Sequence, residues 1–293
     1  MRRFYEDTRA PVLISFDLDM NSNLLLLTFN ETVRVDTLDV TEITIQDYPE
    51  INETDPSSYR TLVAGQAITK DDTLLTIALN SNDTNYIKRF TNLATNESNT
   101  FISFSNLTLA DMNGNPVTSI PANNASQVAD FVPDTTSPFL VYYELNLTSE
   151  EVYFVFDETV NTNSFSVTSL TLVSGGNTSY QLTGGEIIVD QNDTMFTLIL
   201  TTSDLNEVKK LEDLATSINN TFLEFDAALL TDMNNNYVEP VVNESRQAAQ
   251  FTQDTVQPEL LSYNLDMNMG LLHLSFSETV SYTHLTLPTI YSV

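Results

Sequence analysis

The chain has 293 residues, with 11 Lys and Arg against 40 Asp and Glu, and carries a formal net charge of −29. So acidic a chain repels nucleic acids and anionic membrane surfaces, because both attract proteins through cationic side chains. The absence of Cys excludes disulfide scaffolds and Cys-ligated zinc or iron–sulfur sites. Since 41% of the residues are hydrophobic, the chain can bury enough apolar surface to fold, into about two domains.

From the N-terminus, short runs rich in Thr, Ile, Leu, Val and Phe alternate with clusters of Asn, Asp, Ser and Pro that suit turns. The runs predict strands at residues 12–16, 24–33, 42–46, 59–64, 73–79 and 100–109. Roughly seven strands in about 120 residues are typical of a two-sheet antiparallel sandwich. No run approaches the roughly 20 apolar residues of a membrane-spanning helix.

One short helix interrupts the strand pattern in each half of the chain. Its apolar residues recur at helical spacing and are expected to lie in the core: Ile87, Phe90 and Leu93 in one half, Val208, Leu211 and Leu214 in the other. Asp83 or Asp204 is expected to cap the helix. The basic pairs 88–89 and 209–210 fall on the opposite side, where we expect solvent.

An internal repeat organises the whole chain. The pattern Phe-x-x-Asp-Thr-x-x-Pro begins at Phe4, Phe131 and Phe251. The pattern Phe-x-Glu-Thr-Val begins at residues 29, 156 and 276, and Asp-Met-Asn-x-Asn begins at Asp111 and Asp232. The chain therefore contains two full copies of one unit and the start of a third.

With Phe-x-Glu-Thr-Val, Asp-Met-Asn-Gly-Asn-Pro and Asp-Thr-x-x-Pro, residues 4–280 resemble the bacterial-type Ig-like repeats of surface-layer proteins and large adhesins. The second copy has Asn235 where the family usually has Gly, and Asn tolerates the left-handed backbone nearly as well. The resemblance implies a fold and not a site, since such modules serve as spacers, adhesins and glycan binders alike.

We therefore predict an all-β chain of tandem Ig-like antiparallel β-sandwich repeats, each with one short inserted helix. Residues 1–10 are expected to form an inter-repeat joint, 11–131 the first repeat, 132–251 the second, and 252–280 the start of a third. Residues 281–293 break the pattern, and residues 280–285 resemble a translated sequencing adapter, so we expect a non-native tail there. The whole is expected to be a fragment of a longer array.

The strand order predicts that acidic side chains meet at one pole of each repeat. The first strand runs away from that pole and the second returns to it, so Glu31 should approach Asp7 and the Asp111 turn. By the same reasoning Asp134, Glu158 and Asp232 should converge, and Asp19 should face Asp134 from the opposite pole of the first repeat. Their counterparts in the third unit are Asp254 and Glu278.

Such clusters of carboxylates repel one another unless a cation or backbone N–H groups satisfy them, and calcium prefers six to eight oxygen ligands of this kind. The nine acidic residues just named are therefore candidate calcium ligands at the joints between repeats. The alternative is that the aspartates only cap turns and that Glu31 accepts backbone N–H groups. Both readings stay open at this stage, and no other cofactor is indicated.

Sequons for N-glycosylation favour an extracellular or cell-surface glycoprotein. They begin at Asn30, Asn52, Asn82, Asn96, Asn106, Asn124, Asn146, Asn177, Asn192, Asn219 and Asn243.

No catalytic motif is present, and His273 lies in a predicted strand. We therefore expect a non-enzymatic structural or adhesive spacer whose partners are neighbouring repeats of the same chain and, in addition, an extracellular protein or glycan, with no nucleic acid and no membrane insertion. A glycan- or protein-binding module acting through loops at one pole is the alternative. A hydrolase-associated domain is a remote third, which would need two carboxylates about 5–9 Å apart in a deep cleft.

Overall fold

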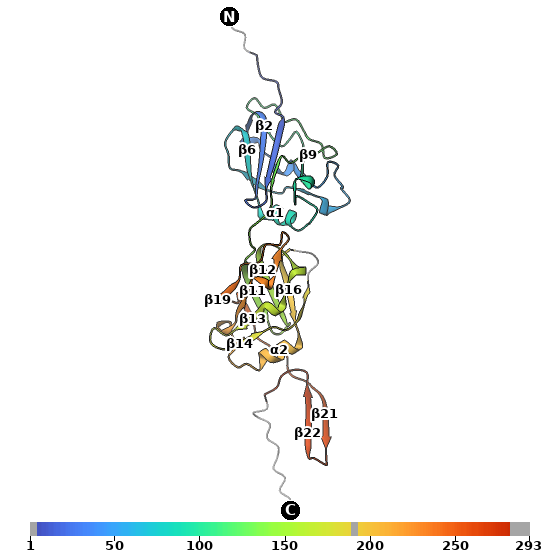
Figure 1. The fold of residues 1–293 in the computed structure, drawn as a ribbon, viewed down its shortest axis with the longest axis vertical. Helices are drawn as coiled ribbons and strands as arrows, with labels where there is room; N and C mark the ends of the chain where they lie inside the picture. Colours follow the sequence, from blue (N-terminus) through green and yellow to red (C-terminus); the bar gives the residue numbers. More distant parts are fainter. Residues whose placement is uncertain (1–4, 189–192, 282–293) are drawn as a thin grey trace, which may run out of the picture.

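The computed structural model describes residues 5–188 and 193–281. These residues form two β-sandwich modules and a two-stranded hairpin, which follow one another along the long axis of the molecule (Figure 1). Each module carries one short α-helix at the end that faces the next unit (Figure 1). The predicted all-β architecture of repeated units, each with one inserted helix, is confirmed.

The first module consists of two sheets. One has the order β10 (Asp130–Val132), β1 (Leu13–Asp19), β2 (Leu24–Arg34), β6 (Asp72–Leu79) and β5 (Gly65–Ala67), with β8 (Ala110–Asp111) on β2. The other has the order β4 (Tyr59–Thr61), β3 (Ile43–Gln46), β7 (Phe101–Phe104) and β9 (Ser126–Gln127). Short 3-10 helices connect them: η1 (Val35–Thr37), η2 (Val40–Glu42), η3 (Pro56–Ser58) and η4 (Glu97–Asn99).

The second module repeats this plan. Its larger sheet has the order β15 (Gly185–Ile188), β16 (Asp193–Leu200), β12 (Glu151–Asn161), β11 (Leu140–Asn146) and β20 (Gln250–Thr252), with β18 (Thr231–Asp232) on β12. Its smaller sheet has the order β14 (Ser179–Gln181), β13 (Leu170–Val173), β17 (Phe222–Phe225) and β19 (Val241–Gln247). Its 3-10 helices are η5 (Thr162–Ser164), η6 (Val167–Ser169), η7 (Ile218–Asn220) and η8 (Ala227–Leu229).

The first and last strands of each module pair in parallel, unlike the antiparallel pairs that the sequence predicts. In the first module β1 lies beside β10, with Asp17 opposite Asp130, and in the second β11 lies beside β20, with Glu144 opposite Gln250. The reason is directional, because the chain enters a module at one pole and leaves at the other. Both terminal strands therefore run towards the same end.

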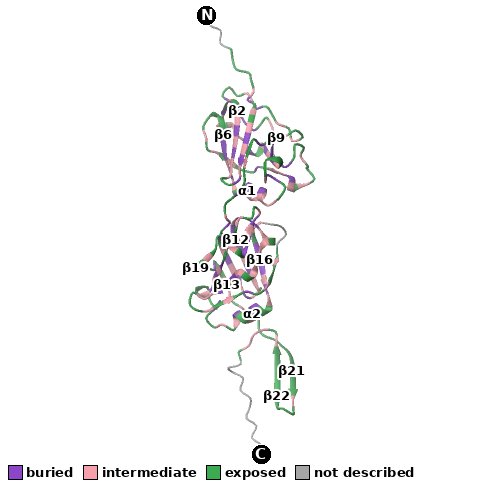
Figure 2. Ribbon diagram, in the orientation of Figure 1, coloured by how far each residue is buried: buried purple, intermediate pink, exposed green. Residues whose placement is uncertain are grey.

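Each module encloses its own core between the two sheets. In the first module, Phe16 and Leu27 from the larger sheet pack in one cluster with Ile45 and Ile102 from the smaller one. The corresponding cluster of the second module contains Tyr143, which is fully buried. The two clusters share no residue, and Figure 2 shows the buried residues inside the two modules, with the hairpin exposed.

The helices are α1 (Ser81–Lys88) and α2 (Thr202–Lys209). As predicted, Ile87 and Val208 are buried in the cores. The predicted capping by Asp83 or Asp204 is wrong, because the residues three positions earlier, Asn80 and Thr201, cap the helices. Asp83 is instead buried and accepts hydrogen bonds from the Arg60 side chain and from the Val63 and Ala64 amides, which ties the helix to the neighbouring loop.

The third unit consists of the hairpin β21 (Leu260–Asp266) and β22 (Leu271–Phe276). Its Tyr263 is 71% exposed, whereas the matching residues Phe16 and Tyr143 are fully buried. The predicted tail lies outside the described residues apart from Ser281. No helix in the described part of the chain has the length and apolar character that crossing a membrane requires.

Candidate functional site at the module joints

Three carboxylates meet at the pole of the second module that faces the first. Asp134 lies in the segment before β11, Glu158 lies on β12, and Asp232 lies on β18, which pairs with β12 next to Glu158. Ligand oxygens of the three side chains all lie within 4.8 Å of one another. All three residues are buried, with exposed fractions of 3%, 6% and 2%. We call these residues the acceptor pole of the second module.

The turn after β18 holds the acceptor pole in shape. Asp232 Oδ1 accepts the amide N–H groups of Asn234 and Asn236, and Asp232 Oδ2 accepts the Asn236 side chain at 2.8 Å. The same Asn236 amide donates to the backbone oxygen of Asp134 at 3.2 Å, which connects two of the three acidic segments. Asn235 has φ of 68°, so it supplies the left-handed residue that the turn needs.

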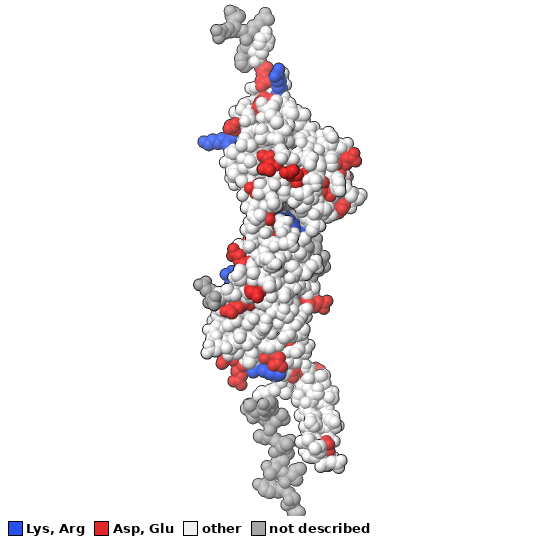
Figure 3. Space-filling view, in the orientation of Figure 1, with Lys and Arg blue, Asp and Glu red and all other residues white. Residues whose placement is uncertain are grey.

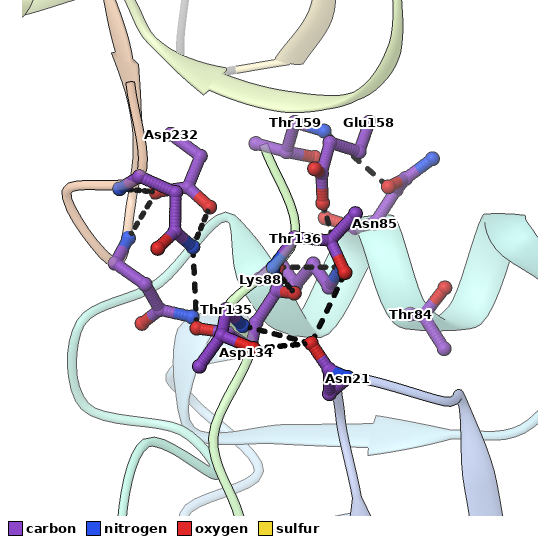
Figure 4. Close-up of polar contacts among 12 residues, drawn as sticks. Asn21, Thr84, Asn85, Lys88, Asp134, Thr135, Thr136, Glu158, Thr159 and Asp232 are labelled. Carbon is purple, nitrogen blue, oxygen red and sulfur yellow. Dashed lines mark hydrogen bonds and ion pairs between the residues drawn. The ribbon is translucent and has the colours of Figure 1, made fainter. Parts of the chain in front are cut away.

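A lysine from the preceding module fills the space between these carboxylates. Lys88 Nζ lies 2.7 Å from Asp134 Oδ2 and 2.6 Å from Glu158 Oε2, and the lysine side chain is only 10% exposed. Figure 4 shows Lys88 reaching from its helix to both carboxylates. The expectation that the basic side of the helix is solvated is wrong for this residue, because the next module covers the end of α1.

Uncharged side chains complete the first joint. Thr159, next to Glu158, donates its amide N–H to Asn85 Oδ1 and its hydroxyl to the Asn85 backbone oxygen. The Asn21 side chain, in the turn after β1, accepts hydrogen bonds from the Thr135 amide and hydroxyl and from the Thr136 hydroxyl (Figure 4). The joint therefore has two parts, a helix end and a turn from the first module.

Beside this joint, Arg89 pairs with Asp193 at 2.7 Å. Thr159 is 1% exposed, so the helix end also excludes water from the neighbourhood of the ion pairs.

The joint between the second module and the hairpin is built in the same way. Lys209 Nζ lies 2.8 Å from Asp254 Oδ2 and 2.7 Å from Glu278 Oε2. Thr279 donates its amide N–H and its hydroxyl to Asn206, as Thr159 does to Asn85. Figure 3 shows basic side chains at the waist between the modules and again just above the hairpin. At each joint the contacts therefore come from an Asn and a Lys three positions apart on the helix of the preceding module.

The first module has the same acceptor pole. Oxygens of Asp7, Glu31 and Asp111 lie within 4.8 Å of one another. Asp111 accepts the same set of hydrogen bonds as Asp232, and the Asn115 side chain donates to the Asp7 backbone oxygen at 3.1 Å. In the described part of the chain, no Lys or Arg forms an ion pair with these three carboxylates. Asp7 is exposed and Glu31 half-buried.

Burial changes the pKa values at the second pole. The pKa of Glu158 is raised to about 7, chiefly by burial and in smaller part by the Asp134 charge, and Lys88 opposes this rise without cancelling it. Although burial lowers the pKa of Lys88, its two carboxylate partners raise it overall, so the lysine stays charged.

The pKa of the third carboxylate of each pole, Asp111 or Asp232, depends on how deeply the pole is buried. At the first pole, hydrogen bonds from Asn115, Asn113 and Gly114 outweigh burial and hold the pKa of Asp111 below its ordinary value. At the second pole, burial and the Asp134 charge raise the pKa of Asp232 despite the same hydrogen bonds. Desolvation, followed by the charges of Asp7 and Asp111, also raises the pKa of Glu31.

The candidate ligands predicted from the sequence come together at each pole, with one exception. Asp19 Oδ1 accepts the amide N–H groups of Asn21 and Ser22, and its neighbour Asn21 is the residue that reaches the second module. Calcium binding by the other carboxylates stays a prediction. Turn capping, the alternative, is what Asp111 and Asp232 do towards their own loops.

Sequence reasoning missed the residues that fill the poles. The signal was present, because Asn-x-x-Lys recurs in both helices, at Asn85 to Lys88 and at Asn206 to Lys209. The Thr of each Glu-Thr-Val motif was a second signal, since Thr159 and Thr279 bond to those asparagines.

No protein-family model and no curated protein matches the chain. Among solved structures, it is similar to domains 1–6 of the surface-layer protein SbsC, with 10% identity and a TM-score of 0.29 over 92% of this chain and 32% of that chain. A crystal structure of the S-layer protein rSbsC has 12% identity and a TM-score of 0.28 over the same shares. A marsupial T cell receptor has 8% identity and a TM-score of 0.17, over 88% of this chain and 78% of that chain. The chain spans about a third of the two S-layer structures.

Proposed function

We propose that the chain is a non-enzymatic structural segment of an extracellular or cell-surface repeat protein. In this proposal, lysine ion pairs at the joints hold successive modules in one fixed relative orientation. The segment's direct partners are then the neighbouring modules of the same chain. In this proposal the cation at the two joints is the ammonium group of Lys88 or Lys209.

The observation that carries the proposal is that the same set of contacts occurs at both joints of the chain. Lys88 binds Asp134 and Glu158, and Lys209 binds Asp254 and Glu278, with all four distances between 2.6 and 2.8 Å. A connection that served only to link two independent modules would need neither a buried ion pair nor the threonine–asparagine bonds beside it. Because a buried charge is stable only when it is paired, the two modules must keep one relative orientation.

The topology of each module also suits a segment that transmits force. The chain enters at one pole through β1 and leaves at the other through β10, and these two strands are hydrogen-bonded neighbours in parallel. Tension along the chain therefore acts along the strands, whereas the bonds between the strands lie across it. Several bonds must then break together, and the same holds for β11 and β20.

The rival functions find less support at the poles. A binding module acting through pole loops would need those loops free, but at the pole of the second module Asp134 and Glu158 are covered by α1 of the preceding module. A hydrolase would need its carboxylates in an open cleft. Among the described residues, Lys88 is the one titratable residue that lines the cavity of about 140 Å³ at the first joint. The cavity of about 310 Å³ at the second joint includes Asp254 and Glu278, but Lys209 forms ion pairs with both.

Glycosylation stays part of the proposal. Eight sequon asparagines lie exposed: Asn30, Asn52, Asn82, Asn96, Asn106, Asn124, Asn177 and Asn219. Asn146 is half-buried, and Asn192 and the side chain of Asn243 lie outside the described residues.

The test is the distance between two spin labels across the first joint. Because the chain has no Cys, the substitutions Gln66→Cys and Glu186→Cys label two exposed sites, one on β5 of the first module and one on β15 of the second. Pulsed electron resonance should give one narrow distance peak, which Lys88→Met broadens. The exposed Lys70 is the control, since Lys70→Met should leave the peak narrow.

Two results would overturn the proposal. A broad distribution in the unsubstituted chain would mean that the joint does not hold the modules. A peak that stays narrow in Lys88→Met would mean that the lysine is not what holds them. If a chelator broadened the peak, calcium would be the joint cation.

A further inference from the structure

We infer that the acceptor pole of the first module, formed by Asp7, Glu31 and Asp111, is a docking site for the lysine-bearing helix end of another module of this kind. The inference rests on the proposed function, because it assumes that the lysine joint is the way these modules bind one another. The occupant is specific: an α-helix that presents Asn and Lys three positions apart, as α1 and α2 do.

The first support is that the turn at the first pole already has the hydrogen bonds of the occupied second pole. Asn115 donates to the Asp7 backbone oxygen at 3.1 Å and to Asp111 Oδ2 at 2.7 Å. At the occupied second pole the corresponding distances, from Asn236 to Asp134 and to Asp232, are 3.2 and 2.8 Å. Docking therefore needs no rearrangement of the turn, and little conformational entropy is lost in forming the site.

The second support is a pair of residues left uncovered at the first pole and covered at the second. Thr32 is exposed, whereas its counterpart Thr159 is 1% exposed and bonded to Asn85. Met112 is 51% exposed, whereas its counterpart Met233 is half-buried and lines the joint cavity beside Lys88. The residues that the helix end covers on the second module, one polar and one apolar, are therefore exposed at the equivalent positions of the first module.

The third support is charge. Oxygens of the three carboxylates lie within 4.8 Å of one another, and the pKa of Glu31 is raised by desolvation and then by the charges of Asp7 and Asp111, which the charge of Arg9 offsets only in part. At both occupied joints the group that meets the equivalent Asp and Glu is a lysine ammonium. The same acidic set with the same neighbouring Thr and Met therefore favours a lysine helix over a metal ion, which would use neither the Thr nor the Met.

The experiment inserts a second copy of residues 132–252 between Tyr5 and Glu6 of the full chain. The inserted module has its own core, and its α2 then stands before Asp7 at the spacing that places Lys209 before Asp254 in the original chain. Spin labels at Glu186→Cys of the inserted copy and at Gln66→Cys report on the new joint. In a parallel sample, Gln66→Cys with Glu186→Cys of the original copy reports on the natural joint.

We expect a narrow distance peak across the new joint, its loss when Lys209 of the inserted copy is replaced by Met, and no change with Lys210→Met. Lys210 is a matched control because it is adjacent and exposed and, among the described residues, forms an ion pair only with Glu207 of the same helical segment. The Glu31→Gln and Asp7→Asn double variant should also lose the peak.

Three outcomes would overturn the inference. The new joint could give a broad distribution while the natural joint stays narrow, which would leave the proposed function standing. The peak could survive Lys209→Met in the inserted copy. It could also require added calcium, which would assign the pole to the metal. If the natural joint were broad as well, the proposed function itself would fail.

Discussion

The acceptor poles of the first and second modules are built from equivalent residues, two Asp and one Glu from the same three segments, yet they lie in different surroundings. Asp7 is exposed and Glu31 half-buried, whereas their counterparts Asp134 and Glu158 are 3% and 6% exposed. The difference arises from one helix end, which places Lys88 between the carboxylates of the second pole. A site can thus be prepared by its own module and completed by a neighbour.

The comparison also separates what hydrogen bonds do from what burial does. Asp111 and Asp232 accept the same bonds from their turns, but the pKa of Asp111 is lowered and that of Asp232 is raised. Local bonds favour the charged form in both modules. Covering the pole removes water and brings the Asp134 charge into play, and at the second pole this outweighs the local bonds.

The largest effect is expected from Lys88→Glu. This substitution would place a fourth carboxylate among Asp134, Glu158 and Asp232, so the buried pole must open to water. We expect the joint to lose about 3 kcal/mol, the cost typical of removing one partner of a buried pair. Calorimetry should show a lower melting temperature for the second module, and small-angle scattering should show a less rigid particle. Lys70→Glu makes the same charge change at an exposed site and should change neither.

The second effect is a pH dependence located at Glu158. Its pKa is about 7 in the folded chain against an ordinary value of 4.5, so between these values the folded state binds more protons than the unfolded state. Stability from this group is therefore present below pH 4.5 and decreases as the pH rises towards 7. Because each unit between pKa 4.5 and about 7 corresponds to about 1.4 kcal/mol, the loss is about 3 kcal/mol.

Melting curves at about pH 5 and about pH 8 test this, because the second module contains no His and its Asp and Glu residues with ordinary pKa values stay ionised in that window. Glu158→Gln should remove most of the decrease, because glutamine does not ionise. Glu31→Gln at the more exposed first pole should change the profile less. A wild-type module that is equally stable at both pH values would contradict the assignment.

A third, smaller effect should distinguish the two threonines of the Glu-Thr-Val motifs. Thr159→Val removes the hydroxyl that bonds the Asn85 backbone oxygen at 2.8 Å, and we expect a loss of about 1 kcal/mol in urea unfolding of the second module. Thr32→Val, at the exposed position of the first module, should stay within about 0.5 kcal/mol. Equal losses would mean that the threonine acts within its own module and not across the joint.

The smallest effect is expected from Asn21→Ala. Its side-chain oxygen accepts three hydrogen bonds from Thr135 and Thr136, but these groups lie at an exposed part of the joint. We expect a loss below about 1 kcal/mol, because water can replace an exposed partner. Asn21→Thr should restore part of it, since Thr148 reaches the hairpin segment from the same place at the second joint. No recovery with threonine would show that the two turns bind differently.

Much of the candidate site follows from sequence because it is local to one module. The repeats, the alternation of buried residues on the strands, and the return of β2 to the pole where β1 begins bring Asp7 and Glu31 together. The wrong helix cap shows the limit of spacing arguments, since both Asn80 and Asp83 suit a cap and only the buried contacts of Asp83 decide between them.

Sequence alone determined that three carboxylates meet at the end of a repeated β-sandwich, since strand direction and turn chemistry act within about 120 residues. Only the tertiary structure decided what faces them. Lys88 lies on a helix of one module and meets Glu158, 70 positions later, on a strand of the next. Its helix presents it to solvent until the second module covers that end. Whether a charged side chain is solvated or buried depends on packing between modules, and no periodicity within a single helix reports that.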